Sequence, residues 1–463
     1  MTENTTICAL ATSPGVSPIA IIRLSGEKAI EIADRIFQSR SKKKLVDQKA
    51  NTIHVGTIND GSELLDEVVV SIYRCPSSFT GENIVEISCH GSVYIQKQIL
   101  QLLLKNGAQI AKPGEFTQRA FLNGKMDLSQ AEAVADLISS TTRSSQKVAL
   151  RQMRGGFSTE LATLREQLIK FSSLIELELD FSEEDVEFAD RKELRQLIDQ
   201  IEEKVLSLRD SFHLGNVIKD GIPVAIIGET NVGKSTLLNA LLNDEKAIVS
   251  DIPGTTRDVI EDTVNLQGTT FRFFDTAGLR ETIDAIEKMG IQRTYSALKK
   301  AIIVLLVVDT TNPLSQILER INKVRELISS DQHLIIIANK TDIGQPKTLR
   351  ILEDVPLADH EQLILLSAKK RDNLNNLVAA MKDMIDTEGH EDETIITNVR
   401  HYDALNRAAE AIECIKSSME QQISGEFLTR DIHDCMNALG EITGQITNNE
   451  ILGHIFKNFC IGK

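Results

Sequence analysis

A glycine-rich stretch, GETNVGKST at residues 228–236, has the residue types and spacing of a phosphate-binding loop. It follows the apolar run PVAIIG and fits the pattern G-x-x-x-x-G-K-[ST]. Glycines let backbone N–H groups surround phosphate oxygens, Lys234 can reach the β- and γ-phosphates, and Ser235 offers a hydroxyl to Mg²⁺. We therefore expect a nucleoside triphosphate to be contacted by Asn231, Val232, Gly233, Lys234, Ser235 and Thr236.

Two further motifs indicate which base is bound. NKTD at residues 339–342 follows the apolar run LIIIA, and SAK at residues 367–369 ends the next one. The Asp342 carboxylate can accept two hydrogen bonds from guanine N1–H and its exocyclic amine, whereas adenine presents no such pair of donors. The predicted guanine contacts are Asn339, Lys340, Asp342, Ser367 and Ala368.

The stretches GTTRD (254–258) and DTAG (275–278) supply the remaining nucleotide motifs. Thr256 is predicted to close a switch loop over Mg²⁺, and Asp275 to add a carboxylate to the shell around the ion. Together the motifs resemble a small GTPase domain of about 160 residues. Leu279 stands where Ras-like proteins have the glutamine that orients water, so another group must do this. The motifs add to the predicted GTP contacts Thr255, Thr256, Asp275, Thr276, Ala277 and Gly278.

The elements that must position these motifs divide the chain into four segments. Residues 1–120 mix short β-like runs with helices, which predicts an α+β domain. Residues 121–215 are helical, and we expect a capping box with Ser129 as N-cap and Glu132 three residues later. Residues 216–382 alternate apolar strands with helices, which predicts a parallel sheet covered on both faces. Residues 383–463 are helical again, so we expect one helical domain with the α/β domain inserted into it.

Composition bounds the class of protein. The chain is 41% hydrophobic and 25% charged, with no apolar run of membrane-spanning length, so we expect a cytoplasmic globular protein. Six scattered cysteines without C-x-x-C pairs argue against a zinc site or a disulfide framework. The net charge of −16 is concentrated in residues 158–215 and 383–463. The basic clusters are residues 40–45 and the set Arg143, Lys147, Arg151 and Arg154, for which solvated helix faces are the favoured interpretation.

Longer stretches carry a narrower resemblance. These are SPGVSPIAIIRLSG, PSSFTGENIVEISCHGS, KPGEFTQRAFLNGKMDLSQAEAVADLI, the inserted GTPase domain and the terminal CIGK. Together they resemble the tRNA-modifying GTPase family MnmE (TrmE) over essentially the whole chain. The resemblance implies a homodimer whose N-terminal domain dimerises and binds a one-carbon tetrahydrofolate of formyl or methylene type. With a flavin- and NADH-using partner of the MnmG/GidA type, in a heterotetramer or larger assembly, it would add an aminomethyl or carboxymethylaminomethyl group to carbon 5 of the wobble uridine of certain tRNAs.

The resemblance also assigns residues. It implies that Glu287 orients the attacking water and that Ser235 and Thr256 hold Mg²⁺. A K⁺ ion beside the γ-phosphate would supply the positive charge that an arginine finger supplies elsewhere. Its ligands would be Asn231, Ser250, Ile252 and Thr255, of which Ser250 also joins the GTP contacts; for Asn231 a turn-favouring role is an equal alternative. The implied folate contacts are Arg23, Glu82, Lys125 and Lys463.

Cys460, fourth from the end, has three interpretations. A prenylation box is the weakest, because the chain ends in Gly462 and Lys463. A buried structural cysteine beside apolar neighbours is stronger, and a nucleophile or acid/base group near the folate site is the one that the resemblance favours. A rival function for the whole chain is a regulatory GTPase switch in ribosome assembly or membrane association. No basic RNA-binding module supports that rival.

Overall fold

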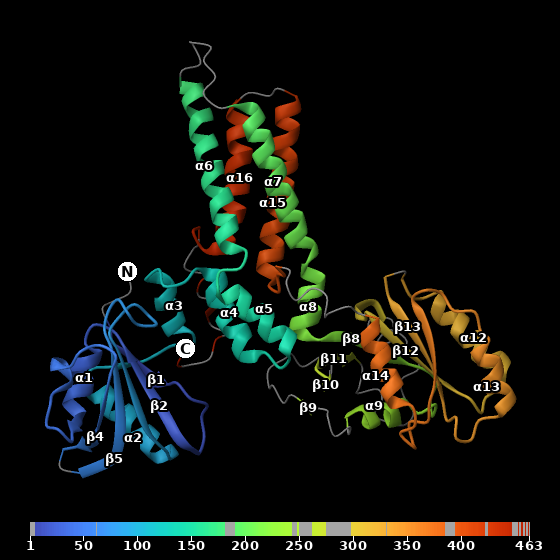
Figure 1. Ribbon diagram of the computed structural model, residues 1–463, viewed down its shortest axis with the longest axis horizontal. Helices are drawn as coiled ribbons and strands as arrows, with labels where there is room; N and C mark the ends of the chain where they lie inside the picture. Colours follow the sequence, from blue (N-terminus) through green and yellow to red (C-terminus); the bar gives the residue numbers. More distant parts are fainter. Residues whose placement is uncertain are drawn as a thin grey trace, which may run out of the picture. The chain divides into compact units, whose positions relative to one another are not determined.

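The computed structural model describes residues 5–61, 63–180, 190–242, 248–249, 262–274, 298–329, 331–384, 394–421 and 425–446, with residues 452, 455, 456, 459 and 462 near the C-terminus. The chain divides into two compact units (Figure 1). One comprises Met1–Ile138, Leu150–Val205 and Asp403–Lys463, and the other comprises Ser139–Ala149 and Leu206–Tyr402. The predicted multidomain fold class is confirmed, while the exact domain boundaries stay a prediction.

A seven-stranded sheet organises the N-terminal part of the first unit. Its order is β3 (Phe37–Ser39), β4 (Thr52–Asp60), β5 (Glu63–Tyr73), β6 (Ile84–Gly91), β2 (Ser17–Ser25), β1 (Ile7–Leu10) and β7 (Gln109–Ile110). Neighbours are antiparallel except β1 and β7. Alternate residues such as Ile22 and Val70 form one core with α1 (Ala29–Ile36) and α2 (Val93–Lys105), so both helices cover the same face.

Helices make up the rest of the first unit. Before the inserted segment come α3 (Glu115–Leu122), α4 (Leu128–Ser139), α5 (Arg143–Met153), α6 (Ser158–Asp180) and α7 (Arg191–Asp210), and after it come α15 (Val399–Glu420) and α16 (Gly425–Thr443). The first residues of α5, up to Ala149, belong to the other unit. The two groups pack together, because Arg165 on α6 donates to the Met436 carbonyl on α16 at 3.1 Å, and Lys416 on α15 pairs with Asp199 on α7 at 2.7 Å. The four long helices α6, α16, α7 and α15 lie side by side (Figure 1). Within the described part of the chain, no helix is long and apolar enough to cross a membrane.

The start of α4 differs from the prediction. Asp127, not Ser129, is the N-cap: its Oδ1 accepts from the Gln130 N–H at 2.8 Å, and Gln130 Oε1 accepts from the Asp127 N–H at 2.8 Å. The Ser129 hydroxyl donates to the same Asp127 oxygen, and Ser158 donates to the other. The reciprocal capping box therefore lies two residues earlier than expected, because a carboxylate with two hydroxyl donors is the better-supported N-cap.

A second seven-stranded sheet lies in the other unit. Its order is β14 (Glu361–Leu365), β13 (His333–Asn339), β12 (Ile303–Asp309), β8 (Ile222–Ile227), β11 (Thr269–Phe274), β10 (Asp262–Leu266) and β9 (Ile248–Val249). The five predicted strands, β8 and β11 to β14, are parallel as expected. β10 and β9, which were not predicted, extend the sheet in antiparallel pairing, so the whole sheet is mixed.

Helices cover both faces of this sheet, as predicted. α9 (Lys234–Leu242) and α14 (Leu374–Asp383) share a core with one face, while α12 (Leu314–Arg325) and α13 (Pro346–Glu353) contribute to the core on the other. α8 (Phe212–Asp220) leads into β8. The carboxyl ends of β8, β12, β13 and β14 meet at one edge of the sheet, where ligands of doubly wound α/β folds bind.

Candidate functional site

The phosphate-binding loop connects β8 to α9 with a backbone that only certain residues allow. Gly228 and Gly233 have φ values of +151° and +103°, and Asn231 has +62°. A Cβ at Gly228 would lie 2.4 Å from the Val307 carbonyl, and one at Gly233 would lie 2.3 Å from Asn339 Nδ2. Both glycines are therefore required by close approach as well as by conformation. The left-handed Asn231 supports its role as a turn residue, and its K⁺ ligand role stays a prediction.

Lys234, the first residue of α9, turns its ammonium back into the loop. Its Nζ donates to the carbonyl oxygens of Gly228 at 2.7 Å and Glu229 at 2.6 Å. These bonds hold the Lys234 ammonium at the N-terminus of α9, where the helix dipole adds positive potential. Ser235 and Thr236 follow in the first turn of the helix, as the motif predicted. The arrangement fits a bound polyphosphate.

Asn339 joins the phosphate loop to the predicted base pocket. It ends β13 and is 3% exposed. Its Nδ2 donates to the Val232 carbonyl at 2.8 Å, and its Oδ1 accepts from the Ala368 N–H at 3.0 Å. One amide side chain therefore ties together segments that are more than a hundred residues apart in the sequence. We call these two bonds the Asn339 clamp.

Asp342 is positioned by the third motif. Its Oδ1 accepts from the Ser367 hydroxyl at 2.8 Å, and its Oδ2 lies 3.9 Å from Lys370 Nζ. Ser367 is fully buried and also accepts from the Lys370 N–H, which fixes its hydroxyl. A carboxylate held this way can present its remaining lone pairs to the two donors of guanine. The sequence-predicted residues Asn339, Asp342, Ser367 and Ala368 are thus brought to one place.

Lys340 forms a second connection to the phosphate loop. With φ at +66°, it directs its Nζ to the Asn231 carbonyl at 2.9 Å and to Asp309 Oδ2 at 2.5 Å. Asp309, at the end of β12, is a site residue that the sequence analysis missed. Burial opposes its ionisation, but hydrogen bonds from Lys340 and Thr311 outweigh burial and hold the pKa of Asp309 below its ordinary value. It is therefore a carboxylate at neutral pH.

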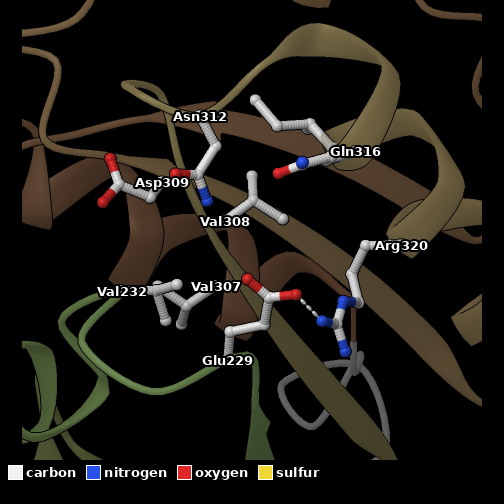
Figure 2. Close-up of a pocket in the computed structure, with 9 residues that line it drawn as sticks. Glu229, Val232, Val307, Val308, Asp309, Asn312, Gln316 and Arg320 are labelled. Carbon is white, nitrogen blue, oxygen red and sulfur yellow. Dashed lines mark ion pairs between the residues drawn. The ribbon is translucent and has the colours of Figure 1, made fainter.

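A small pocket lies beside the phosphate loop (Figure 2). Val232, Val307 and Val308 line its base, and side chains of α12 close it from the opposite side. Glu229, in the loop, forms an ion pair with Arg320 on α12. The ion pair compensates a negative charge in the segment that must hold phosphates.

Several predicted site residues lie outside the described residues. These are the switch, K⁺ and Mg²⁺ positions Ser250, Ile252, Thr255 and Thr256; the DTAG residues Asp275, Thr276, Ala277 and Gly278; Leu279; the predicted catalytic residues Glu287 and Cys460; and the folate residue Lys463. Their roles stay predictions. The described nucleotide site therefore comprises the phosphate loop, Asp309 and the base pocket.

The other three predicted folate residues meet at the loop that joins β5 to β6. Arg23, on β2, lies over the Phe79 ring at 5.7 Å and pairs with Glu86 at 2.7 Å. Glu82 accepts from the Ser25 hydroxyl at 2.6 Å and lies 3.2 Å from Arg119 Nη1. Lys125 Nζ donates to the Pro76 carbonyl at 3.1 Å. The structure thus brings together charges that are far apart in the sequence.

Arg119 completes this N-terminal cluster and was not predicted. Its side chain is 7% exposed and lies between Glu82 and Glu115. Its buried Nε has no hydrogen-bond partner among the described residues. The only sequence signal was the i,i+4 spacing of Glu115 and Arg119, which indicates a helical ion pair but not its burial.

The end of the chain reaches the same cluster. Arg23 Nη1 donates to the Gly462 carbonyl at 3.4 Å, and a Cβ at Gly462 would lie 2.2 Å from the Leu10 carbonyl. Phe456 and Phe459 pack against Gly114, just before α3. The described part of the C-terminal tail is therefore docked beside Arg23 rather than frayed.

Comparison with known proteins agrees with this architecture. The profile for the GTP-binding protein TrmE N-terminus matches residues 6–125, and that for the MnmE helical domain matches residues 128–460. The tRNA modification GTPase MnmE of Bacteroides fragilis is 54% identical over 466 residues, covering 99% of both chains, and that of Bacteroides thetaiotaomicron is 52% identical over 468 residues, with the same coverage. The chain belongs to the MnmE (TrmE) family of tRNA modification GTPases.

Proposed function

We propose that the chain is a GTP-hydrolysing enzyme that, with a flavin-dependent partner, adds an aminomethyl or carboxymethylaminomethyl group to carbon 5 of the wobble uridine of certain tRNAs in the cytoplasm. The tRNA modification GTPase activity follows from family membership. The observation that carries the GTPase part is the Asn339 clamp, which joins the predicted guanine pocket to the phosphate loop. The one-carbon donor, the partner and the ions are the finer parts of the proposal.

At the nucleotide site the chain's own residues bind and orient. Asp342 selects guanine, Lys234 attracts the β- and γ-phosphates, and Ser235 would hold Mg²⁺, which neutralises charge on the phosphate oxygens when bound. Thr256 is the second proposed Mg²⁺ ligand. We propose that K⁺, held by Asn231, Ser250, Ile252 and Thr255, supplies the remaining positive charge, and that Glu287 orients water. The exposed Asn231 amide is compatible with a ligand role.

We propose that the N-terminal cluster binds a one-carbon tetrahydrofolate through Arg23, Glu82, Lys125 and Lys463. Two observations support it. Arg119 has a buried Nε without a partner among the described residues, and the Arg23 guanidinium lies over the Phe79 and Phe116 rings, 5.7 and 5.8 Å from their centroids. Aromatic rings and paired charges suit a flat, polar pterin. Cys460 would act near this cluster, because Gly462 is held beside Arg23.

We propose a homodimer formed through the outer face of the N-terminal sheet. Ile19, Ile53, Val55 and Val69 lie on strands β2, β4 and β5 and are 39–70% exposed. Val55 and Val69 are direct cross-strand partners, so the apolar surface is continuous across strands. Exposed apolar surface of this kind is typical of an interface. Val69→Glu should produce monomers in sedimentation, whereas Lys97→Glu on α2 should not.

The test of the whole proposal is the state of the wobble uridine. Mass spectrometry of tRNA from cells that lack the protein should show unmodified wobble uridine, and the wild-type chain should restore the modification. Asp342→Asn should restore less of it than the wild-type chain, since GTP binding is weakened. Normal modification in the absence of the protein would contradict the proposal and favour a regulatory GTPase switch. Cells that keep the protein but lack the flavin-dependent partner should show the same loss of modification.

A further inference from the structure

Helix α5 of this acidic chain carries three basic residues and no acidic one. Residues 137–159 contain Arg143, Lys147, Arg151 and Arg154 and no Asp or Glu, although the chain has a net charge of −16. The long helices α6 and α7 each carry five acidic residues among their bases. The basic set therefore stands out locally, and it lies on or directly after α5.

The four basic residues form a stripe along one face. At 100° per residue, positions 143, 147, 151 and 154 fall within an arc of about 80°. The opposite face is the packed one, since Ala149 is 3% exposed and Gln152 is 6% exposed. Arg143, Arg151 and Arg154 are exposed and Lys147 is partly exposed. Neither Arg143 nor Arg154 forms an ion pair with another described residue.

The dimensions of the stripe suit a nucleic-acid backbone. With a rise of about 1.5 Å per residue, Arg143 and Arg154 are about 16 Å apart along the helix, so several phosphates could be met in succession. The end of α4 and the loop before α5 add the small hydroxyl residues Ser139, Ser140, Thr141 and Thr142, a type that also contacts phosphates. Thr142 and Ser145 cap the helix reciprocally at 3.2 and 3.0 Å, which holds the stripe in place.

We propose that this α5 basic stripe binds the phosphate backbone of the tRNA substrate. The inference rests on the proposed function for the identity of the nucleic acid. Such contacts fix position and orientation without reading sequence, which suits an enzyme that accepts several tRNAs. Residues 137–159 contribute no carboxylate that would repel RNA, although the chain as a whole has a net negative charge.

The test measures binding of a wobble-uridine tRNA to the full chain over a series of KCl concentrations by fluorescence anisotropy. The logarithm of the binding constant K falls as the logarithm of the salt concentration rises, and each lost phosphate contact makes this slope less steep by about 0.7 to 0.9. Arg143→Gln with Arg154→Gln should therefore reduce the slope by about 1.4 to 1.8, which is about a 25- to 60-fold loss at 0.1 M salt. Arg143→Lys with Arg154→Lys should keep the wild-type slope, because the charge is retained.

Lys170→Gln with Lys192→Gln is the matched control, since both lysines are exposed on the acid-rich helices α6 and α7. The control should bind tRNA like the wild type, and basal GTP hydrolysis should be unchanged in all variants. If the wild type binds tRNA and the Gln variant has the same salt slope, the proposal for the stripe is overturned, while the proposed function of the chain stands. Loss of binding to the flavin-dependent partner with normal tRNA affinity would reassign the stripe to a protein interface. Absence of tRNA binding in the wild type would overturn the proposed function as well.

Discussion

Replacing Asn339 by alanine removes the clamp between the phosphate loop and the base pocket. The change leaves the Val232 carbonyl without its 2.8 Å donor and the Ala368 N–H without its 3.0 Å acceptor. Both residues are buried, at 4% and 2% exposure. Because neither group can turn to solvent without moving its loop, Asn339→Ala should separate the two halves of the nucleotide site.

The size of the effect follows from the two bonds. Each neutral hydrogen bond contributes about 0.5–1.5 kcal/mol, and unsatisfied buried groups move the cost towards the upper end. The total of about 1–3 kcal/mol divides between folding and binding. If half or more falls on binding, the dissociation constant for GTP rises by about 2- to 140-fold, since about 1.4 kcal/mol is tenfold.

Titration with a fluorescent GTP analogue and denaturant unfolding measure the two parts separately. Asn376→Ala is the control, because its Nδ2 donates to Asn373 Oδ1 at 2.6 Å on an exposed surface of the same unit. That variant should bind GTP like the wild type. The reasoning is refuted if Asn339→Ala and the control share both the same GTP affinity and the same free energy of unfolding.

Five further outcomes are expected. Asp342→Asn should weaken GTP binding by about 1 to 3 kcal/mol while xanthine nucleotide binding improves, measured by competition. GTP turnover should rise steeply with K⁺ and not with Na⁺, and Glu287→Ala should slow hydrolysis without weakening binding; equal rates in the two salts would contradict the K⁺ site. Cys460→Ser should abolish wobble-uridine modification while GTP hydrolysis stays near wild type, as mass spectrometry and phosphate release would show. Burial opposes ionisation of Glu361, but the Arg325 hydrogen bond outweighs it and lowers its pKa, so the stability advantage of the wild type over Glu361→Gln should be present at neutral pH and shrink as pH falls below 4.5 in denaturant titrations.

The nucleotide motifs were predictable because a motif that directly follows a parallel strand must lie at the edge of the sheet where ligands bind. Gly228, Asn339 and Ser367 each follow an apolar run, and parallel strands bring such positions to one edge. Asp309 follows an apolar run too, but a single carboxylate after a strand, without a motif around it, does not indicate a particular role. Its role depends on the left-handed backbone of Lys340, which sequence patterns do not specify.

The N-terminal cluster shows a different limit. Arg23 and Glu86 are direct cross-strand partners, yet that pairing exists only once the register of β2 and β6 is known. Arg119 was missed because one of its two ion pairs comes from Glu82, in a loop nearly forty residues earlier, while the pair with Glu115 alone does not indicate burial. The capping box at α4 failed for a local reason: Ser129 and Asp127 are both good N-caps, and Ser158, thirty residues later, supports Asp127.

Charge balance explains why the position between Asn339 and Asp342 carries a lysine. An unpaired carboxylate at Asp309, 7% exposed at the ligand edge of the sheet, would repel a triphosphate. The Lys340 ammonium pairs with the Asp309 carboxylate at 2.5 Å and also donates a hydrogen bond to the Asn231 carbonyl. The lysine therefore compensates a repulsive charge and fixes the turn of the phosphate loop at once. A neutral side chain of equal length could not compensate the charge of Asp309, so Lys340 and the Asn339 clamp together join the base motif to the phosphate loop.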